Sequence, residues 1–290
     1  MTQRKTSMQA HRMGRIWGAG AACLSLWAAP LTLAHSASYL TFGVSEGTSG
    51  GLDHAQVIAK YEGLAQVLSK ALGQKVNVVF VREFKALESG MKDGRFDFVM
   101  ARPSDYPARA LRDDGYRFVA SALPDGQCLI VVPKDSKITT LEGIRGQRIA
   151  MPEQVSYMSR LCRAEMRDNN VLPAKEQVKY VREQGAVTFY LHNKLADVGA
   201  LASYSGAAAK WMQDGQTVLY KGQPQPYFPM IASPKISAAQ VAQVQRSLTE
   251  LGNEDSGQAV LSTIGIQKFD TTSEQRLRKL LPFLEKPETP

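Results

Sequence analysis

Arg102 is the residue whose type and place in the sequence first suggest chemistry. It directly follows residues 96–101, an apolar run whose length and composition predict a buried strand. A guanidinium at the end of such a strand can bind an oxyanion through two parallel hydrogen bonds. Asp97 and Asp105 offer the alternative, which is a structural ion pair with the same guanidinium.

Hydroxyl and backbone N–H groups from other segments could join Arg102. Residues 45–51 read Ser-Glu-Gly-Thr-Ser-Gly-Gly between a predicted strand and a predicted helix, a setting that suits an anion. The segment lacks the Lys-Ser/Thr ending of a P-loop, so nucleotide binding is not expected, and a flexible turn is the alternative. The residues predicted from the pattern to face a ligand are Ser45, Glu46, Thr48, Arg102, Ser104, Tyr106, Ser156, Tyr157, Ser203 and Tyr204.

Several of these candidates also have a purely structural explanation. Ser104 and Tyr106 are expected on the loop that carries Arg102, where Tyr106 either lines a pocket or fills a seam between two lobes. Ser156 suits the N-cap of a helix as well as a ligand contact. Glu46 either pairs with a cationic group of the ligand or is a solvated acid.

The sequence contains no visible arrangement of catalytic or metal-binding residues. His54 and His192 have no partner at ligand spacing, and no Ser-His-Asp or Cys-His set can be recognised. We therefore expect no catalytic residue, no metal and no cofactor. Turnover of a bound ligand would contradict this expectation.

The N-terminal segment predicts export. Arg4, Lys5, Arg12 and Arg15 precede an apolar run, residues 16–33, and small residues follow it. This is the layout of a secretory signal peptide, here residues 1–36, with cleavage near residue 34 or a few residues later. A membrane anchor is the alternative, but the run is short and is broken by glycines and a proline. The expected location is the periplasm.

The charge of the remaining chain gives no indication of a polyanionic partner. The full sequence has 35 basic and 27 acidic residues. Removing the four basic residues of the signal peptide leaves 31 − 27 = +4. No cluster or helical stripe concentrates this charge, so nucleic acid is not an expected partner. A small anionic ligand is compatible with it, and we expect a monomer.

Two cysteines, Cys128 and Cys162, remain after the signal peptide. An oxidising compartment permits a disulfide between them. Both have apolar neighbours in sequence, which suit a buried free thiol equally well. The sequence leaves these two alternatives open.

Strand and helix patterns alternate along the chain. Residues 39–44, 75–81 and 96–101 predict strands, with helices over 53–72 and 84–91 between them. A second alternating series runs from residue 128 to residue 202, and helical segments close the chain. The pattern predicts an α/β protein of two lobes, each with a mixed, mostly parallel sheet flanked by helices. Residues 38–124 plus 228–290 form the first expected lobe and residues 125–227 the second, with hinge crossings near 123–127 and 222–229 and a ligand cleft between the lobes.

An ordered set of segments resembles the phosphate, phosphite and phosphonate-binding proteins of ABC importers. The segments include YLTFGVSEGTSGG, KVNVVFVREFKALESGMKDGRFDFVMARPSDY, CLIVVPKDSKITTLEGIRGQRIAM and NKLADVGALASY. The resemblance covers nearly all of the mature chain and implies a type II periplasmic-binding fold, a small anionic ligand and ABC permease subunits as partners. It adds Phe84 to the candidates, at a position where the family has a cleft tyrosine. Of a Ser-Thr-Ser run that is frequent in the family, this sequence keeps only Ser156. Gly185 and Ala202 stand where some members of the family have acidic residues that bind a ligand amine.

Three classes of function are compatible with these features. The first is a transport receptor that closes around a phosphonate, phosphite or phosphate-like oxyanion, with the membrane reached only through the permease. The second is a periplasmic binding module that serves a sensor or another non-transport partner, or that binds a carboxylate or other non-phosphorus ligand. The third is an enzyme on the same fold. We expect the first.

Overall fold

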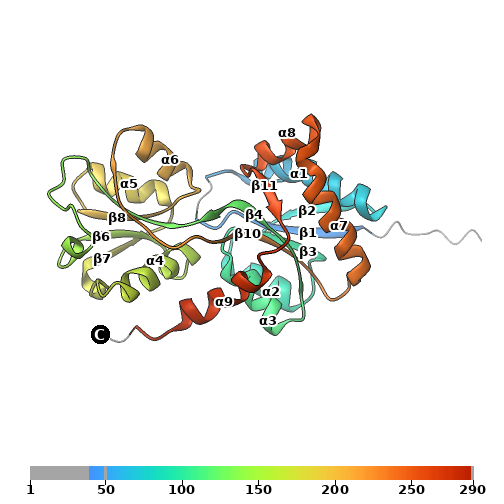
Figure 1. Ribbon diagram of the computed structural model, residues 1–290, viewed down its shortest axis with the longest axis horizontal. Helices are drawn as coiled ribbons and strands as arrows, with labels where there is room; N and C mark the ends of the chain where they lie inside the picture. Colours follow the sequence, from blue (N-terminus) through green and yellow to red (C-terminus); the bar gives the residue numbers. More distant parts are fainter. Residues whose placement is uncertain (1–38, 49–50, 289–290) are drawn as a thin grey trace, which may run out of the picture. The chain divides into compact units, whose positions relative to one another are not determined.

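The computed structural model describes residues 39–48 and 51–288. The predicted signal peptide lies outside the described residues. Strands and helices alternate in two mixed sheets flanked by helices, as the sequence pattern predicts (Figure 1). Within the described ranges, no helix combines the length and the apolar character that a membrane span requires.

The first lobe contains a six-stranded sheet. Its strands are β1 (Leu40–Ser45), β2 (Val76–Phe80), β3 (Phe98–Ala101), β4 (Arg117–Gly126), β10 (Gln225–Ala232) and β11 (Lys268–Asp270), in the order β11-β4-β10-β3-β1-β2. β1 pairs in parallel with β2 and β3, and the other pairings are antiparallel. Ser45 at the end of β1 lies opposite Ala101 at the end of β3, so the residues that follow the two strands emerge side by side.

The second lobe contains a five-stranded sheet. Its strands are β5 (Cys128–Val132), β6 (Ile149–Pro152), β7 (Val178–Val181), β8 (Val198–Ala202) and β9 (Thr217–Lys221), in the order β7-β6-β8-β5-β9. β6 pairs in parallel with β7 and β8, whereas β5 is antiparallel to β8 and β9. Only Gln127 separates β4 from β5, and residues 222–224 separate β9 from β10. We propose these two short passages as the hinge.

Helices cover both faces of each sheet. The first lobe has α1 (His54–Leu72), α2 (Phe84–Lys92), α3 (Asp105–Asp113), α7 (Ala238–Glu250), α8 (Asp255–Ile264) and α9 (Glu274–Glu285), and the second has α4 (Tyr157–Asp168), α5 (Gln184–His192) and α6 (Gly206–Gln213). Successive β3 side chains point to opposite faces, so Phe98 and Met100 pack in the core under α1, α7 and α8. Val99 and Ala101 pack in the other core, with α2, α3 and α9. Short 3₁₀ turns occur at Glu142–Ile144, Lys175–Gln177 and Leu251–Asn253.

The helix ends agree well with the capping signals in the sequence. Asp53 and Gln56 form the predicted capping box of α1, in which each side chain bonds the backbone N–H of the other residue. Gly73 ends the helix with φ at 62°, a left-handed conformation that glycine adopts without steric cost. Ser237 and Gln240 cap α7 in the same way.

The segment that follows Arg102 differs from its prediction. A loop was expected here, but Ser104 is the N-cap residue of α3 and Tyr106 lies inside that helix. Pro107 is compatible with a helix at this point, because the backbone nitrogens of a first helical turn need no partner within the helix. The prediction also omitted β4, β9, β11 and α6.

A disulfide joins Cys128 of β5 to Cys162 of α4, with 5.3 Å between the Cα atoms. The bridge resolves the choice that the sequence left open, and it ties a strand next to the proposed hinge to a helix of the same lobe. Cross-linking residues 34 positions apart removes conformational freedom from the unfolded chain.

Replacing both cysteines with alanine is expected to lower the free energy of unfolding by about 3 kcal/mol, because the unfolded chain regains that freedom. Urea unfolding of the mature protein, followed by circular dichroism, measures the change. Dithiothreitol should shift the midpoint of the wild type toward the midpoint of the double variant and leave the variant unaffected. Equal midpoints of the wild type with and without the reductant would contradict the prediction.

Candidate functional site

A cleft between the two lobes brings together most of the predicted ligand-binding residues. A small inner cavity of about 10 Å³, near the minimum that holds one water molecule, has walls from both lobes. Among the eleven predicted residues, its lining includes Glu46, Thr48, Phe84, Arg102, Ser156, Tyr157 and Tyr204. The lobes are therefore close together at this point, and the backbone N–H of Gln184 donates to the carbonyl of Thr48 across the cleft at 3.3 Å.

Glu46 and Arg102 form a buried ion pair at the floor of the cleft. The parallel register of β1 and β3 makes them neighbours, because each follows directly on paired strand ends. Arg102 Nε donates to Glu46 Oε2 at 2.5 Å, and the two residues are 7% and 5% exposed. Lys60 Nζ donates to Glu46 Oε1 at 2.8 Å, and the Tyr61 hydroxyl donates to the same oxygen. Glu46 is therefore not the solvated acid of the alternative explanation.

Aromatic rings enclose the guanidinium of Arg102. Its central carbon lies 4.7 Å from the ring centroid of Phe228, 5.4 Å from that of Tyr227 and 5.8 Å from that of Tyr204. Tyr204 stacks on Tyr227 with centroids 4.0 Å apart. A cation over aromatic faces is stabilised by their negative charge density. Arg102 thus pairs with Glu46 rather than with Asp97 or Asp105, the partners weighed from the sequence.

The charges around Glu46 favour its ionised form. Burial alone would raise the pKa of Glu46, but the attraction of Arg102 and Lys60 and the hydrogen bonds from Lys60 and Tyr61 outweigh it, so the pKa lies below its ordinary value of 4.5. Burial and the neighbouring carboxylate raise the pKa of Tyr61 well above its ordinary value, so this hydroxyl stays protonated and donates.

A second buried carboxylate, Asp105, links the two lobes. It is fully buried at the start of α3, and Arg109 on the same helix donates to its Oδ2 at 2.7 Å. Arg160 of α4 donates to the same oxygen from the opposite lobe. Burial raises the pKa of Asp105 above its ordinary value of 3.8 despite the two guanidinium groups. Oδ1 of Asp105 has no hydrogen-bond partner among the described residues.

Four predicted ligand residues do not line the inner cavity. Ser45 is fully buried at the end of β1, and the Ser104 hydroxyl donates to the carbonyl of Pro226 at 3.0 Å. Tyr106 stacks on Phe84 with 5.7 Å between centroids, within the first lobe. The Ser203 hydroxyl accepts from the backbone N–H of Gln127 at 3.0 Å, in the proposed hinge. Ser156 lines the cavity and also caps α4, because its hydroxyl accepts from the N–H of Ser159.

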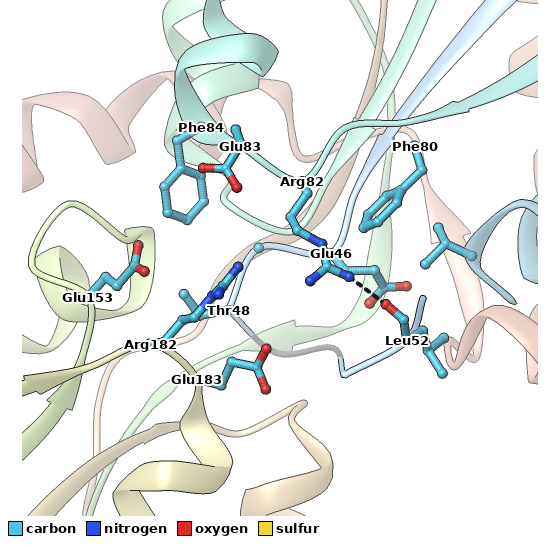
Figure 2. A pocket seen from close by; sticks show the side chains of 12 residues that line it. Glu46, Thr48, Leu52, Phe80, Arg82, Glu83, Phe84, Glu153, Arg182 and Glu183 are labelled. Atoms are coloured by element: carbon cyan, nitrogen blue, oxygen red, sulfur yellow. Dashed lines mark hydrogen bonds between the residues drawn. The ribbon is translucent and has the colours of Figure 1, made fainter. Parts of the chain in front are cut away.

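An outer cavity of about 230 Å³ adjoins the inner one and shares Glu46, Gly47, Thr48 and Phe84 with it. Its lining adds charged residues that were not predicted from the sequence: Arg82 and Glu83 from the first lobe, and Glu153, Arg182 and Glu183 from the second (Figure 2). The sequence carried a signal for four of them, since Arg-Glu follows a valine both at residues 81–83 and at residues 181–183. In the described part of the chain, no group of three His, Cys, Asp or Glu side chains could hold a metal ion.

Comparisons with known proteins agree with this geometry. PhnD1 from Prochlorococcus marinus, in complex with methylphosphonate, has 14% identity, a TM-score of 0.69 and coverage of 86% of this chain and 97% of its own. XAC2383 from Xanthomonas citri bound to ATP has 18% identity, a TM-score of 0.67 and coverage of 86% and 98%. A phosphonate ABC transporter binding protein of Pseudomonas aeruginosa has 16% identity, a TM-score of 0.64 and coverage of 85% of each chain. No curated protein sequence matches.

These structures share the two-lobed fold of periplasmic binding proteins, and at such low identity the likeness concerns the fold alone. The sequence itself carries the assignment further, because residues 51–277 match a single family over most of the chain. The resemblance seen in the sequence segments is thereby confirmed. The chain belongs to the family of periplasmic substrate-binding proteins of phosphonate ABC transporters.

Proposed function

We propose that this protein captures a small phosphonate-type oxyanion between its two lobes in the periplasm and delivers it to the permease subunits of an ABC importer. The observation that carries the proposal is the cleft, whose two adjoining cavities take their walls from both lobes. A ligand that touches both walls stabilises the closed arrangement over the open one, which is the requirement for ligand-driven closure.

The walls of the cleft favour an anion. Ser156, Tyr157 and Met158 at the N-terminal end of α4 line the inner cavity, and Gln184 at the start of α5 lines it too. Backbone N–H groups at a helix start carry partial positive charge and suit phosphonate oxygens. The outer cavity has room for a small organic anion, whereas the inner cavity has room for little more than water.

Our proposed ligand site comprises the seven predicted residues that line the inner cavity together with the adjoining outer cavity, which has room for the ligand. In this proposal, Glu46 and Arg102 form a rigid charged floor, and Thr48, Phe84 and Tyr204 shape the walls. We propose a monomer that binds without turnover and without a cofactor. The family's role in transport supports binding rather than catalysis.

A thermal-shift screen tests the proposal. The mature protein, starting at Ser38, is heated with phosphate, phosphite, methylphosphonate, sulfonates, carboxylates or amino acids. A ligand at 100 times its dissociation constant should stabilise the folded protein by about 2.7 kcal/mol. We expect the largest shift with a phosphorus oxyanion. A shift with only a cationic or neutral solute would contradict the ligand class.

A cleft-blocking variant supplies the control. Thr48 lines both cavities, so Thr48→Phe should abolish the ligand-induced shift by filling the space that the ligand needs. Thr249→Phe adds the same ring at an exposed position of α7 and should retain the full shift. An equal shift in both variants would place the bound ligand outside the cleft.

A further inference from the structure

Arg82 and Arg182 occupy equivalent places in the two lobes. Arg82 lies between β2 and α2, Arg182 lies between β7 and α5, and each directly precedes the N-cap glutamate of the following helix. Both side chains line the outer cavity. In the close view, the Arg182 side chain extends toward Arg82, whose guanidinium is turned to the carbonyl of Leu52 (Figure 2).

Neither arginine forms an ion pair with a carboxylate of the described residues. Arg82 donates to the backbone carbonyl of Leu52 at 2.9 Å, but no described carboxylate lies within 4.0 Å of either guanidinium. Arg182 makes no side-chain hydrogen bond with the described residues. Two exposed cations on opposite walls of one cavity repel each other, and an anion bound between them would attract both.

Arg102 is not the cation that binds an anion in the outer cavity. Its guanidinium is buried, pairs with Glu46 and lies over Phe228. A ligand that took Arg102 would leave Glu46 short of one of its hydrogen-bond donors. Arg82 lies over the ring of Phe80, with 5.7 Å from its central carbon to the ring centroid. Neither Arg82 nor Arg182 pairs with a described carboxylate, and both line the cavity that has room for an anion.

Three carboxylates surround the two arginines. Glu83, Glu153 and Glu183 line the same cavity, and none of them forms an ion pair within the described residues. They lie around the two guanidinium groups, above, beside and below them in the view of Figure 2. A compact anion placed between the arginines keeps its charge close to both cations. An extended polyanion would bring negative charge against the three carboxylates, which costs free energy.

We propose that Arg82 and Arg182 form a two-lobe clamp for a single compact dianionic headgroup, such as a fully ionised phosphonate. The inference rests on the proposed function and deepens it by naming the residues that distinguish a dianionic ligand from a monoanionic one. The anion replaces repulsion between the lobes with attraction to both of them, and it can do so only when the cleft is closed. A monoanion of the same shape gains less from the two cations.

Isothermal titration calorimetry with two probes of equal shape tests the clamp. Methylphosphonate is a dianion at alkaline pH, and methanesulfonate is a monoanion. The wild type should bind methylphosphonate more tightly. Arg82→Gln and Arg182→Gln should each weaken methylphosphonate binding by about 10-fold or more, because each removes a charge-assisted contact. Both substitutions should shrink the preference for methylphosphonate over methanesulfonate.

Matched variants control for the loss of one positive charge. Arg145→Gln in the second lobe and Arg246→Gln in the first change exposed arginines that line neither cavity, and both should bind methylphosphonate like the wild type. ATP, an extended polyanion, should not displace methylphosphonate from the wild type.

The outcomes separate the clamp from the proposed function. Methylphosphonate binding that is unchanged in both clamp variants overturns the clamp and leaves the function intact. ATP binding as tight as that of methylphosphonate overturns the restriction to compact anions. No binding of methylphosphonate, phosphate or phosphite by the wild type overturns the proposed function, and the clamp with it.

Discussion

Replacing Glu46 with glutamine is expected to lower the free energy of unfolding by about 3–5 kcal/mol. The substitution preserves the shape of the side chain but removes the charge that compensates Arg102. Arg102 is only 7% exposed, so water cannot replace the lost carboxylate. An uncompensated charge at such a site costs much of its hydration free energy. Urea unfolding of the mature protein measures the loss.

A second substitution tests the cause. Arg102→Met in the Glu46→Gln background removes the stranded cation, so the double variant should recover more than half of the loss. Arg102→Met alone should be milder than Glu46→Gln, because Lys60 and Tyr61 still hold the carboxylate. Glu62→Gln, at an exposed position of α1, should leave the midpoint unchanged. If the losses of unfolding free energy from the two substitutions simply add in the double variant, the stranded charge of Arg102 is not the cause.

Asp105→Ala is the other substitution from which we expect a loss of about 3–5 kcal/mol. Within the described residues, Asp105 is the carboxylate that pairs with both Arg109 and Arg160. Its removal leaves two cations from different lobes beside a buried void. Small-angle X-ray scattering should also detect a larger radius of gyration, because the ion pair between the lobes is lost. Asp113→Ala removes an exposed carboxylate from the same helix and should change neither measurement.

The two carboxylates should respond to pH in opposite directions. The pKa of Glu46 is lower in the folded protein than its ordinary value of 4.5, so its contribution is present above that pH and is lost as pH falls through the folded pKa. The pKa of Asp105 is raised from 3.8, so its contribution is full below that pH and declines as pH rises through the folded pKa. The stability difference from the wild type should therefore shrink on acidification for Glu46→Gln and grow for Asp105→Ala. Parallel pH profiles of the two variants would argue against these shifts.

The sequence predicted the elements that have strong local signals. The capping residues and the apolar period of α1 placed that helix to within one residue, since both signals lie inside the segment itself. The strands β3 and β8 were visible as short apolar runs that are buried on both faces. The α6 segment was missed because it is only eight residues long and begins Gly-Ala-Ala-Ala, which shows no polar and apolar alternation.

The candidate site was easier to predict from the sequence than the contacts of its residues were. The ends of β1, β3 and α4 pointed to Glu46, Arg102 and Ser156, because strand and helix ends are predictable. The pairing of Glu46 with Arg102 depends on the register between β1 and β3, which is a long-range property. Arg82 and Arg182 were missed for the same reason, since only the closed cleft brings residues 100 positions apart to one cavity.

The disulfide between Cys128 and Cys162 also determines in which cellular compartment the protein can be produced in its stable, cross-linked form. A reducing cytosol keeps cysteines in the thiol form, so protein made there without the predicted signal peptide would lack the disulfide. A deficit of about 3 kcal/mol raises the unfolded fraction by roughly two powers of ten. Such a preparation would be cleared by proteases or would aggregate. Recombinant material for the binding experiments should therefore be exported to an oxidising compartment or refolded with a redox couple.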